Sequence, residues 1–307
     1  MILSIIDLGS NSARMDIVQI DEKSETHKYL ERCRELVRLS EGMNADGCLQ
    51  PDAIERSIDA LIEFKEIMRG YNADDCIAAA TAAVRKAGNS DEFCLRVLEE
   101  TGISLNVIPG EQEAEYDFRG VMSSLDIDNC VITDTGGGST EFILVSDGEP
   151  LARTSIPVGA VNMTEQFLSC GETYEAMDAL SDYIKSQLDK IGWLDDAEGL
   201  PIVGLGGSVY NLAAVYSDAP GAERGALHGV SISADNVKST FKKLCSLTPS
   251  ERTDAGVEQG REDTIIAGIM PTAELAEKIS SDSVIVSCAG LKEGILAEFL
   301  ENLGIPY

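Results

Sequence analysis

The feature that most constrains the fold of this chain is a pattern that occurs twice: a short apolar run followed by aspartate, glycine and serine at the same spacing. Its two occurrences are Asp7-x-Gly9-x-x-Ser12, after residues 3–6, and Asp134-x-Gly136-x-x-Ser139, after residues 130–133. They lie 127 residues apart, counted from Asp7 to Asp134. Solenoid repeats have much shorter periods, of about 20–50 residues. The spacing therefore predicts two domains of one type.

Each occurrence is predicted to lie at the end of a buried strand. Glycine has no Cβ, so the backbone can turn sharply there and approach a ligand closely. Successive N–H groups in such a turn form a concave site for an anion. An ordinary glycine-rich turn is the alternative reading of either loop taken alone. The flanking strands are predicted at 3–6, 15–20 and 28–37 around the first loop, and at 130–133, 142–145 and 151–156 around the second.

A third glycine-rich loop, Gly204-Leu205-Gly206-Gly207-Ser208, follows a predicted strand at 201–203 and opens a helix that runs to Val215. A strand, a glycine loop and a helix N-terminus together form an anion site. The rest of the pattern is typical of an α/β protein. Further helices are predicted at 51–68, 91–100, from 111, at 160–168, 174–191, 234–245, 263–279 and 291–303, and further strands at 76–81, 104–108 and 284–287.

The composition excludes several classes of function. The formal net charge of −29 disfavours binding to the backbone of nucleic acids. No apolar run approaches the length of a membrane span, and the N-terminus lacks the basic region of a signal peptide, so a cytoplasmic protein is expected. Eight scattered cysteines form neither a zinc pattern nor a disulfide scaffold. Two histidines make a His-rich metal site or a Ser-His-Asp triad improbable.

Three glycine loops and two aspartates that begin such loops predict a phosphate site with a metal ion. Mg²⁺ prefers carboxylate and water oxygens and commonly bridges phosphates, so Asp7 and Asp134 are the predicted ligands. Turn capping is the alternative role of each aspartate. Arg85 follows a strand, where it contacts a phosphate or is a surface arginine. Glu113 is a candidate to orient and deprotonate water, although its spacing alone is more typical of an acid in the first turn of a helix.

The chain resembles the exopolyphosphatase / guanosine pentaphosphate phosphohydrolase family, within the actin, Hsp70 and sugar-kinase superfamily, over nearly its whole length. The motifs that carry the resemblance are Ile6-Asp7-Leu8-Gly9-Ser10-Asn11-Ser12, Thr81-Ala82-Ala83-Val84-Arg85, Gly110-Glu111-Gln112-Glu113-Ala114, Phe118-Arg119-Gly120-Val121, Asp134-Thr135-Gly136-Gly137-Gly138-Ser139-Thr140-Glu141, Gly204-Leu205-Gly206-Gly207-Ser208 and Gly290-Leu291-Lys292-Glu293-Gly294-Ile295-Leu296.

The resemblance implies an α/β fold of two ribonuclease-H-like (actin-like ATPase) domains with an interdomain active-site cleft. Domain I is expected at 1–120 and domain II at 121–290, with the last helix, about 291–307, packed back on domain I. The implied activity is hydrolysis of the terminal phosphoanhydride of polyphosphate or pppGpp, which depends on Mg²⁺ or on Mn²⁺ in its place. A homodimer is expected from the family.

The same resemblance assigns roles to individual residues. Glu113 aligns with the catalytic glutamate, Asp134 with the metal-associated aspartate, and Glu141 with a second active-site acid. The complete predicted site has Glu113, Arg85 and Glu141 as catalytic residues; Gly9, Ser10, Asn11, Ser12, Arg85, Gly136, Gly137, Gly138, Ser139, Gly206, Gly207 and Ser208 as phosphate-binding residues; and Asp134, Asp7 and Glu113 as metal ligands.

The chain departs from the family pattern at three places. Arg14 stands where an aromatic or aliphatic residue is usual, and either contacts a phosphate or is a charge on the strand surface. Gln112 replaces the first acid of a Glu-Glu pair. The chain is expected to lack the C-terminal helical domain of long members, which favours short polyphosphate or a nucleotide as substrate. A kinase-like phosphotransferase and a non-catalytic nucleotide sensor are the alternative functions.

Overall fold

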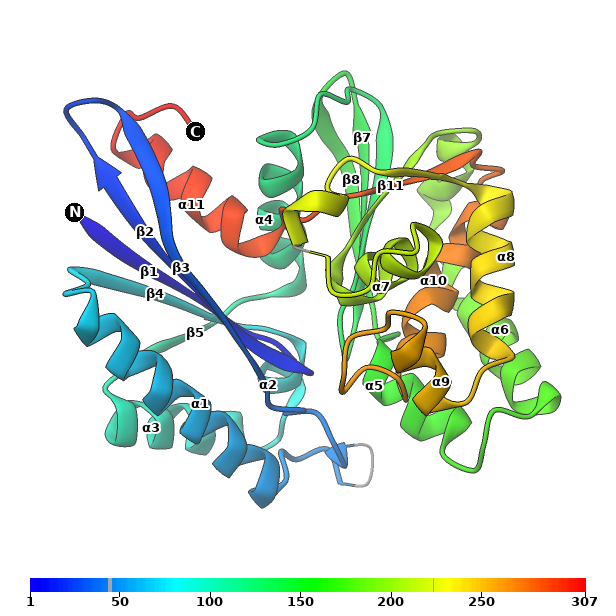
Figure 1. The fold of residues 1–307 in the computed structure, drawn as a ribbon, viewed down its shortest axis with the longest axis horizontal. Coiled ribbons are helices and arrows are strands. Elements are labelled where there is room, and N and C mark those ends of the chain that lie inside the picture. Colours follow the sequence, from blue (N-terminus) through cyan, green and yellow to red (C-terminus); the bar gives the residue numbers. More distant parts are fainter. Residues whose placement is uncertain (44–45, 223) are drawn as a thin grey trace. The chain divides into compact units, whose positions relative to one another are not determined.

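The chain is divided into two compact units (Figure 1). The structure, a computed structural model, describes residues 1–43, 46–222 and 224–307. Unit 1 contains Met1–Ser123 and Leu291–Tyr307, and unit 2 contains Ser124–Gly290. The first boundary, after Ser123, lies three residues beyond the predicted one at 120. The helix that begins at Gly110 continues to Met122 and therefore carries the chain past residue 120 within unit 1. The second boundary lies at the predicted residue 290.

Unit 1 is built on a sheet with the strand order β3-β2-β1-β4-β5. β1, β2 and β3 form an antiparallel meander, and β4 and β5 run parallel to β1. This order is the ribonuclease-H-like arrangement that the resemblance implies. The elements are β1 Ile2–Leu8, β2 Ser12–Asp21, β3 Thr26–Leu36, α1 Pro51–Gly70, β4 Asp75–Ala80, α2 Ala82–Lys86, α3 Ser90–Thr101, β5 Leu105–Val107, α4 Gly110–Met122 and α11 Leu291–Asn302.

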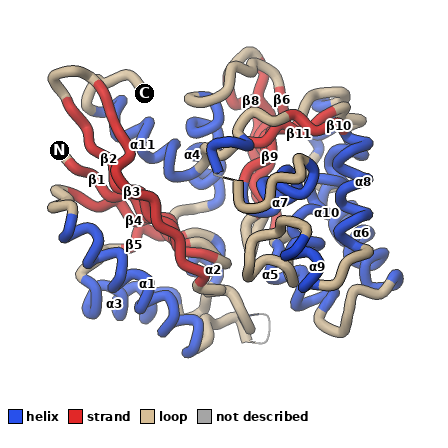
Figure 2. The backbone as a smooth tube through the Cα atoms, viewed as in Figure 1, coloured by secondary structure: helices blue, strands red, loops and turns tan. Residues whose placement is uncertain are grey.

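Unit 2 repeats this order and extends it by one strand (Figure 2). β8-β7-β6-β9-β11 matches β3-β2-β1-β4-β5 in order and direction, and β10 pairs antiparallel with β11. The two α/β domains of one type are therefore confirmed. The elements are β6 Cys130–Thr135, β7 Thr140–Ser146, β8 Glu149–Ile156, α5 Ala160–Met163, the π-helix η2 Thr164–Leu168, α6 Tyr174–Leu188, η3 Gly192–Ala197, β9 Ile202–Leu205, α7 Gly206–Tyr216, η4 Arg224–Leu227, β10 Ser231–Ser233, α8 Ala234–Cys245, α9 Pro249–Asp254, α10 Ile265–Lys278 and β11 Ser283–Val286.

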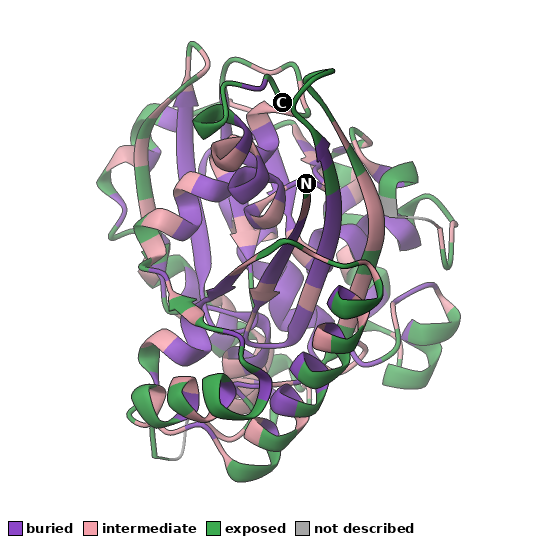
Figure 3. Cartoon of the chain, turned by 90° about the vertical axis from the view of Figure 1, so that its left-hand side faces the viewer, coloured by how far each residue is buried: buried purple, intermediate pink, exposed green. Residues whose placement is uncertain are grey.

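Both faces of the unit 1 sheet are covered, as the mostly buried strands β1 and β2 in Figure 3 indicate. Side chains alternate between the two faces of a strand. Ile6 and Leu8 belong to the core that α1 and α3 complete. Leu3 and Ile5 belong to the core that α4 and α11 complete. This second layer explains why the last helix returns to unit 1.

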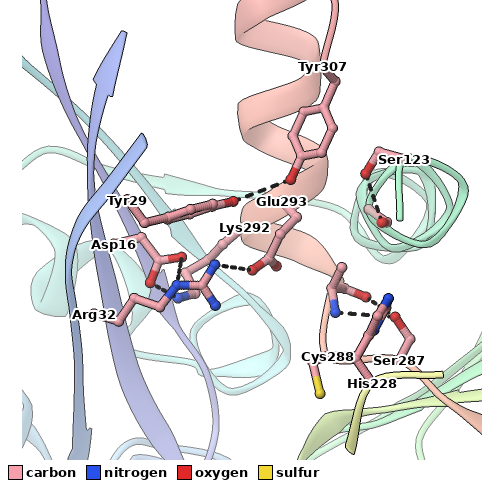
Figure 4. Close-up of polar contacts among 12 residues, drawn as sticks. Asp16, Tyr29, Arg32, Ser123, His228, Ser287, Cys288, Lys292, Glu293 and Tyr307 are labelled. Carbon is pink, nitrogen blue, oxygen red and sulfur yellow. Dashed lines mark hydrogen bonds and ion pairs between the residues drawn. The ribbon is translucent and has the colours of Figure 1, made fainter. Parts of the chain in front are cut away.

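An ionic network around the buried Asp16 connects α11 to the sheet (Figure 4). Asp16, only 1% exposed, pairs with Lys292 on α11 and lies 4.0 Å from the Arg32 guanidinium. Arg32 also lies 3.5 Å from Glu293. The Arg32 guanidinium stacks over the ring of Tyr29, whose pKa is raised by burial. Removing Lys292 would leave the buried carboxylate of Asp16 with only the more distant guanidinium of Arg32, so the pair with Lys292 favours this packing of α11.

The elements that the sequence pattern did not reveal are short. They include α2, α9, η3 and the three-residue strand β10. Elements of three to six residues are too short to display a helical or strand period. Among the helices of the described ranges, none is both long and apolar enough to cross a membrane.

Candidate active site

The predicted residues of unit 1 follow the carboxyl ends of three neighbouring parallel strands. β1 leads into loop 9–12, β4 leads into α2, and β5 leads into α4. Leu8 and Ala80 are register partners, and the Ile108 N–H donates to the Ala80 carbonyl over 3.1 Å. Ligands of open α/β sheets bind at this edge. The topology thus brings loop 9–12, Arg85 and Glu113 to one edge of the sheet.

Loop 9–12 is closed by its own backbone and braced by a second segment. The Gly9 N–H donates to the Ser12 carbonyl over 3.1 Å. The Asn11 carbonyl accepts from the N–H groups of Val37 and Arg38, and the Ser10 carbonyl accepts from Ser40. These bonds satisfy the carbonyl oxygens of Ser10, Asn11 and Ser12 and hold the backbone of the loop in place.

Loop 136–139 of unit 2 has the same construction. The Gly136 N–H donates to the Ser139 carbonyl over 2.9 Å, which is the bond of Gly9 and Ser12 displaced by 127 residues. Its carbonyls accept from the first turn of α5: Gly136 from Ala160, and Gly137 from Val161, both over 2.9 Å. The shared bond shows that the two aspartate–glycine–serine patterns form equivalent loops.

Asn11 is a buried amide that fits a ligand. Its side chain is 6% exposed, and neither its oxygen nor its nitrogen has a hydrogen-bond partner among the described residues. A buried polar group without a partner costs about 1–3 kcal/mol. A phosphate oxygen would be an acceptor for the amide nitrogen, and the phosphate-binding role of Asn11 stays a prediction.

Arg85 and Glu113 form an ion pair in unit 1. Arg85 Nη1 donates to Glu113 Oε2 over 2.9 Å and to the Ile108 carbonyl over 2.7 Å. Both side chains are mostly buried, at 21% and 11% exposed. Arg85 lies on the short helix α2, and Glu113 lies in the first turn of α4. The guanidinium orients the carboxylate of Glu113 at the edge where loop 9–12 begins.

The third glycine loop lies against Asp134 in unit 2. Gly206 has a φ of +80°, and a Cβ at this position would come within 2.5 Å of Asp134 Oδ1. A Cβ at Gly207 would overlap the guanidinium of Arg261. Arg261, which is 6% exposed, also lies 3.2 Å from Glu258. Only glycines allow this close approach of the third loop to a carboxylate and a guanidinium.

Arg261 is a candidate site residue that the sequence motifs do not include. It lies in the segment between α9 and α10, outside every motif quoted above. No local pattern distinguishes it from a surface arginine. Only its packing against Gly207 places its charge beside the glycine loop.

Strand register aligns a row of three polar side chains in each unit. In unit 1 the row is Asp7 on β1, Arg14 on β2 and Arg34 on β3. In unit 2 the equivalent row is Asp134 on β6, Glu141 on β7 and Ser155 on β8. Directly opposed residues share a face of the sheet. The first row carries two cations and one anion, whereas the second carries two anions.

The carboxylates of unit 2 fit a divalent cation. Asp134 and Glu141 are directly opposite each other, and opposed like charges are destabilising. Mg²⁺ takes one or two carboxylates and completes its octahedron with water and phosphate oxygens. In the part of the chain that the structure describes, no group of three or more His, Cys, Asp or Glu side chains is arranged to hold a metal. The metal roles of Asp134, Asp7 and Glu113 stay predictions.

Gly159 packs closely against the backbone of loop 136–139. Its φ of −143° suits any residue, but a Cβ there would fall on the backbone of Gly137 and Gly138. Replacing Gly159 by alanine should therefore destabilise unit 2 by about 1–3 kcal/mol, the usual cost of overpacking, and lower activity by displacing the loop. Urea unfolding and phosphate release are the measurements. Gly192→Ala is the matched control, because nothing lies within 4 Å of a Cβ there; equal stability of the two variants would contradict the expectation.

Comparison with known proteins shows which family the chain matches. The model of the Ppx/GppA phosphatase family matches residues 17–303. "Exopolyphosphatase 2" of Mycobacterium tuberculosis is 29% identical, over 95% of this chain and 97% of that protein. The "Bifunctional 3-dehydroquinate synthase/phosphatase" of Fusobacterium nucleatum is also 29% identical, over 97% of this chain. The chain spans only 46% of that protein's length.

Solved structures agree with the fold. A Ppx/GppA family member from Aquifex aeolicus has a TM-score of 0.79 and is 31% identical, with 98% of each chain covered. An exopolyphosphatase from Cytophaga hutchinsonii has a TM-score of 0.91 over 100% of each chain. At 24% identity, the second likeness shows the fold alone.

Proposed function

Because the chain belongs to the Ppx/GppA phosphatase family, we propose that it hydrolyses the terminal phosphoanhydride of inorganic polyphosphate, of pppGpp, or of both, and releases orthophosphate. The observation that carries the proposal is the Arg85–Glu113 ion pair, which follows β4 and β5 at the same edge of the sheet where β1 leads into loop 9–12. Relatives named exopolyphosphatase and guanosine-5'-triphosphate,3'-diphosphate pyrophosphatase support the choice of substrates.

The glycine loops bind the phosphates. In unit 1 the backbone N–H groups of loop 9–12, the Asn11 amide and the serine hydroxyls of the loop would donate to phosphate oxygens, and in unit 2 the N–H groups and the serine hydroxyl of loop 136–139 offer the same kind of donors. Binding is the difficult step for a chain of charge −29, because its overall field repels a polyanion. Local donors and guanidinium groups therefore have to outweigh that field at short range.

Glu113 orients a water molecule in line with the terminal phosphorus and accepts its proton. Phosphoryl transfer relies on positioning and on stabilisation of charge at the phosphoryl oxygens. The paired guanidinium of Arg85 keeps the carboxylate in one orientation and offers donors to a phosphate oxygen. A general base in such a position contributes about 10²–10⁴-fold to the rate.

Asp134 and Glu141 are the residues that would hold Mg²⁺, or Mn²⁺ in its place. When bound, the ion would offset charge that develops on the phosphate oxygens. Gly206, without a side chain, keeps the space beside Asp134 Oδ1 open. The homodimer, the cytoplasmic location and the lack of nucleic-acid binding are further predictions from the sequence.

A phosphate-release comparison tests the proposal. Purified protein is incubated with short polyphosphate, long polyphosphate, pppGpp or ATP, with Mg²⁺ and with EDTA. We expect release from polyphosphate or pppGpp that is lost in EDTA, and slower release from long than from short polyphosphate. Transfer of phosphate from ATP to an acceptor would favour the kinase-like alternative. Tight binding of pppGpp without any release would favour the sensor.

A further inference from the structure

Ser155 makes a hydrogen bond that the known motifs do not include. Its Oγ lies 2.7 Å from Oε1 of Glu141, directly across from it on the neighbouring strand. A carboxylate can only accept hydrogen bonds, so the serine hydroxyl must be the donor. The bond holds one oxygen of a carboxylate whose residue is only 1% exposed.

The bond sets the orientation of the Glu141 carboxylate. The last torsion of a glutamate side chain is broad and roughly two-fold, so packing alone does not define where its oxygens lie. Once Ser155 holds Oε1, the plane of the carboxylate is defined relative to Asp134, the other acid of the row. Residues that hydrogen-bond to metal ligands in this way tune the affinity for the metal.

The equivalent row of unit 1 has a different charge pattern, because its second position is Arg14 and not a carboxylate. The third position of each row, counted from the aspartate, is Arg34 in unit 1 and Ser155 in unit 2. An arginine would orient the carboxylate but would also cancel part of its charge. A neutral donor orients Glu141 while the two acids keep the charge that a divalent cation needs.

We propose that Ser155 is a positioning residue that orients Glu141 for a divalent cation shared with Asp134. This inference rests on the proposed function only where it gives the bound cation a role in phosphate release. The role of Ser155 can be tested through the affinity of the protein for a metal ion, without any substrate being hydrolysed.

Mn²⁺ binding to purified Ser155→Ala, Ser155→Thr and the unaltered protein provides the test, measured by calorimetry and electron paramagnetic resonance in the presence of orthophosphate. We expect Ser155→Ala to bind Mn²⁺ about 10–100-fold more weakly, as for the loss of a hydrogen bond to a metal ligand. Ser155→Thr keeps a hydroxyl and should restore binding. In activity assays, Ser155→Ala should need more metal for half-maximal rate and approach the original kcat at saturating metal.

Ser186→Ala is the matched control in unit 2, because among the described residues that hydroxyl bonds only to a carbonyl of its own helix, Tyr183 O. Unchanged Mn²⁺ affinity in Ser155→Ala, or no Mn²⁺ binding to the unaltered protein, overturns the proposal. Loss of binding in Glu141→Gln but not in Ser155→Ala would remove Ser155 and leave the proposed function standing. Conversely, the expected metal affinities without phosphate release from any substrate would remove the proposed function and leave the role of Ser155.

Discussion

Glu113→Gln should lower the rate of phosphate release by about 10²–10⁴-fold, the usual contribution of a general base, and leave substrate binding nearly unchanged. Glutamine has the shape of glutamate and can still accept from Arg85 Nη1, which now lies 2.9 Å from Oε2. It cannot accept a proton from water at neutral pH. The loss should therefore appear in kcat, because the phosphates still meet the same loops.

Single-turnover kinetics and equilibrium binding of pppGpp separate these two effects. Glu115→Gln is the matched control, two residues further along α4. Glu115 pairs with Arg119 at 3.0 Å in an i,i+4 arrangement, with both side chains about one-quarter to one-third exposed, and such pairs contribute about 0.3–0.5 kcal/mol. We expect Glu115→Gln to retain activity. Full turnover by Glu113→Gln would remove Glu113 from the mechanism.

Arg252→Met should destabilise unit 2 by about 3–5 kcal/mol, the cost of breaking a buried ion pair by removing one partner. Arg252 is fully buried and donates from Nη1 and Nη2 to the two oxygens of Glu172. Its guanidinium also donates to the carbonyls of Leu244 and Glu262. Methionine fills a similar volume, so the loss comes from the ion pair and the hydrogen bonds and not from a cavity.

The same change should weaken the site, because Glu262 is adjacent to Arg261 in the chain. Arg252 thus anchors the segment that places Arg261 against Gly207. Trp193 is the only tryptophan and lies in unit 2, so its fluorescence during urea unfolding reports on this unit. Lys278→Met is the control, since its partner Asp189 is 69% exposed and exposed pairs contribute about 0–1 kcal/mol. A loss of stability no larger than that of the control would show that the Glu172 pair is not needed.

Much of the fold follows from local chemistry. Loops 9–12 and 136–139 were predictable because each needs glycine and serine at fixed positions after an apolar strand, and that requirement is written in consecutive residues. The Asp147-Gly148 turn between β7 and β8 is of the same kind, since both residues have positive φ. Short elements such as α2 escaped prediction because five residues show no period.

The pairings within the candidate site were not predictable in the same way. Glu113 is 28 residues from Arg85, and the two meet because β4 and β5 are parallel neighbours. Ser155 reaches Glu141 only through the register of β7 with β8, and a slip of one residue would turn it to the other face. Arg261 had no local signal at all.

The sequence by itself determined the duplication, the loops and the two aspartates that begin them, because the conformation of a turn and the apolar character of a strand are written in consecutive residues. The tertiary structure decided which side chains act together. Arg85 with Glu113, and Gly207 with Arg261, are contacts between segments far apart in the chain, whereas Glu141 meets Ser155 across the hairpin of β7 and β8. Such contacts depend on strand order and register, which are set by burial of whole sheet faces and not by any local pattern.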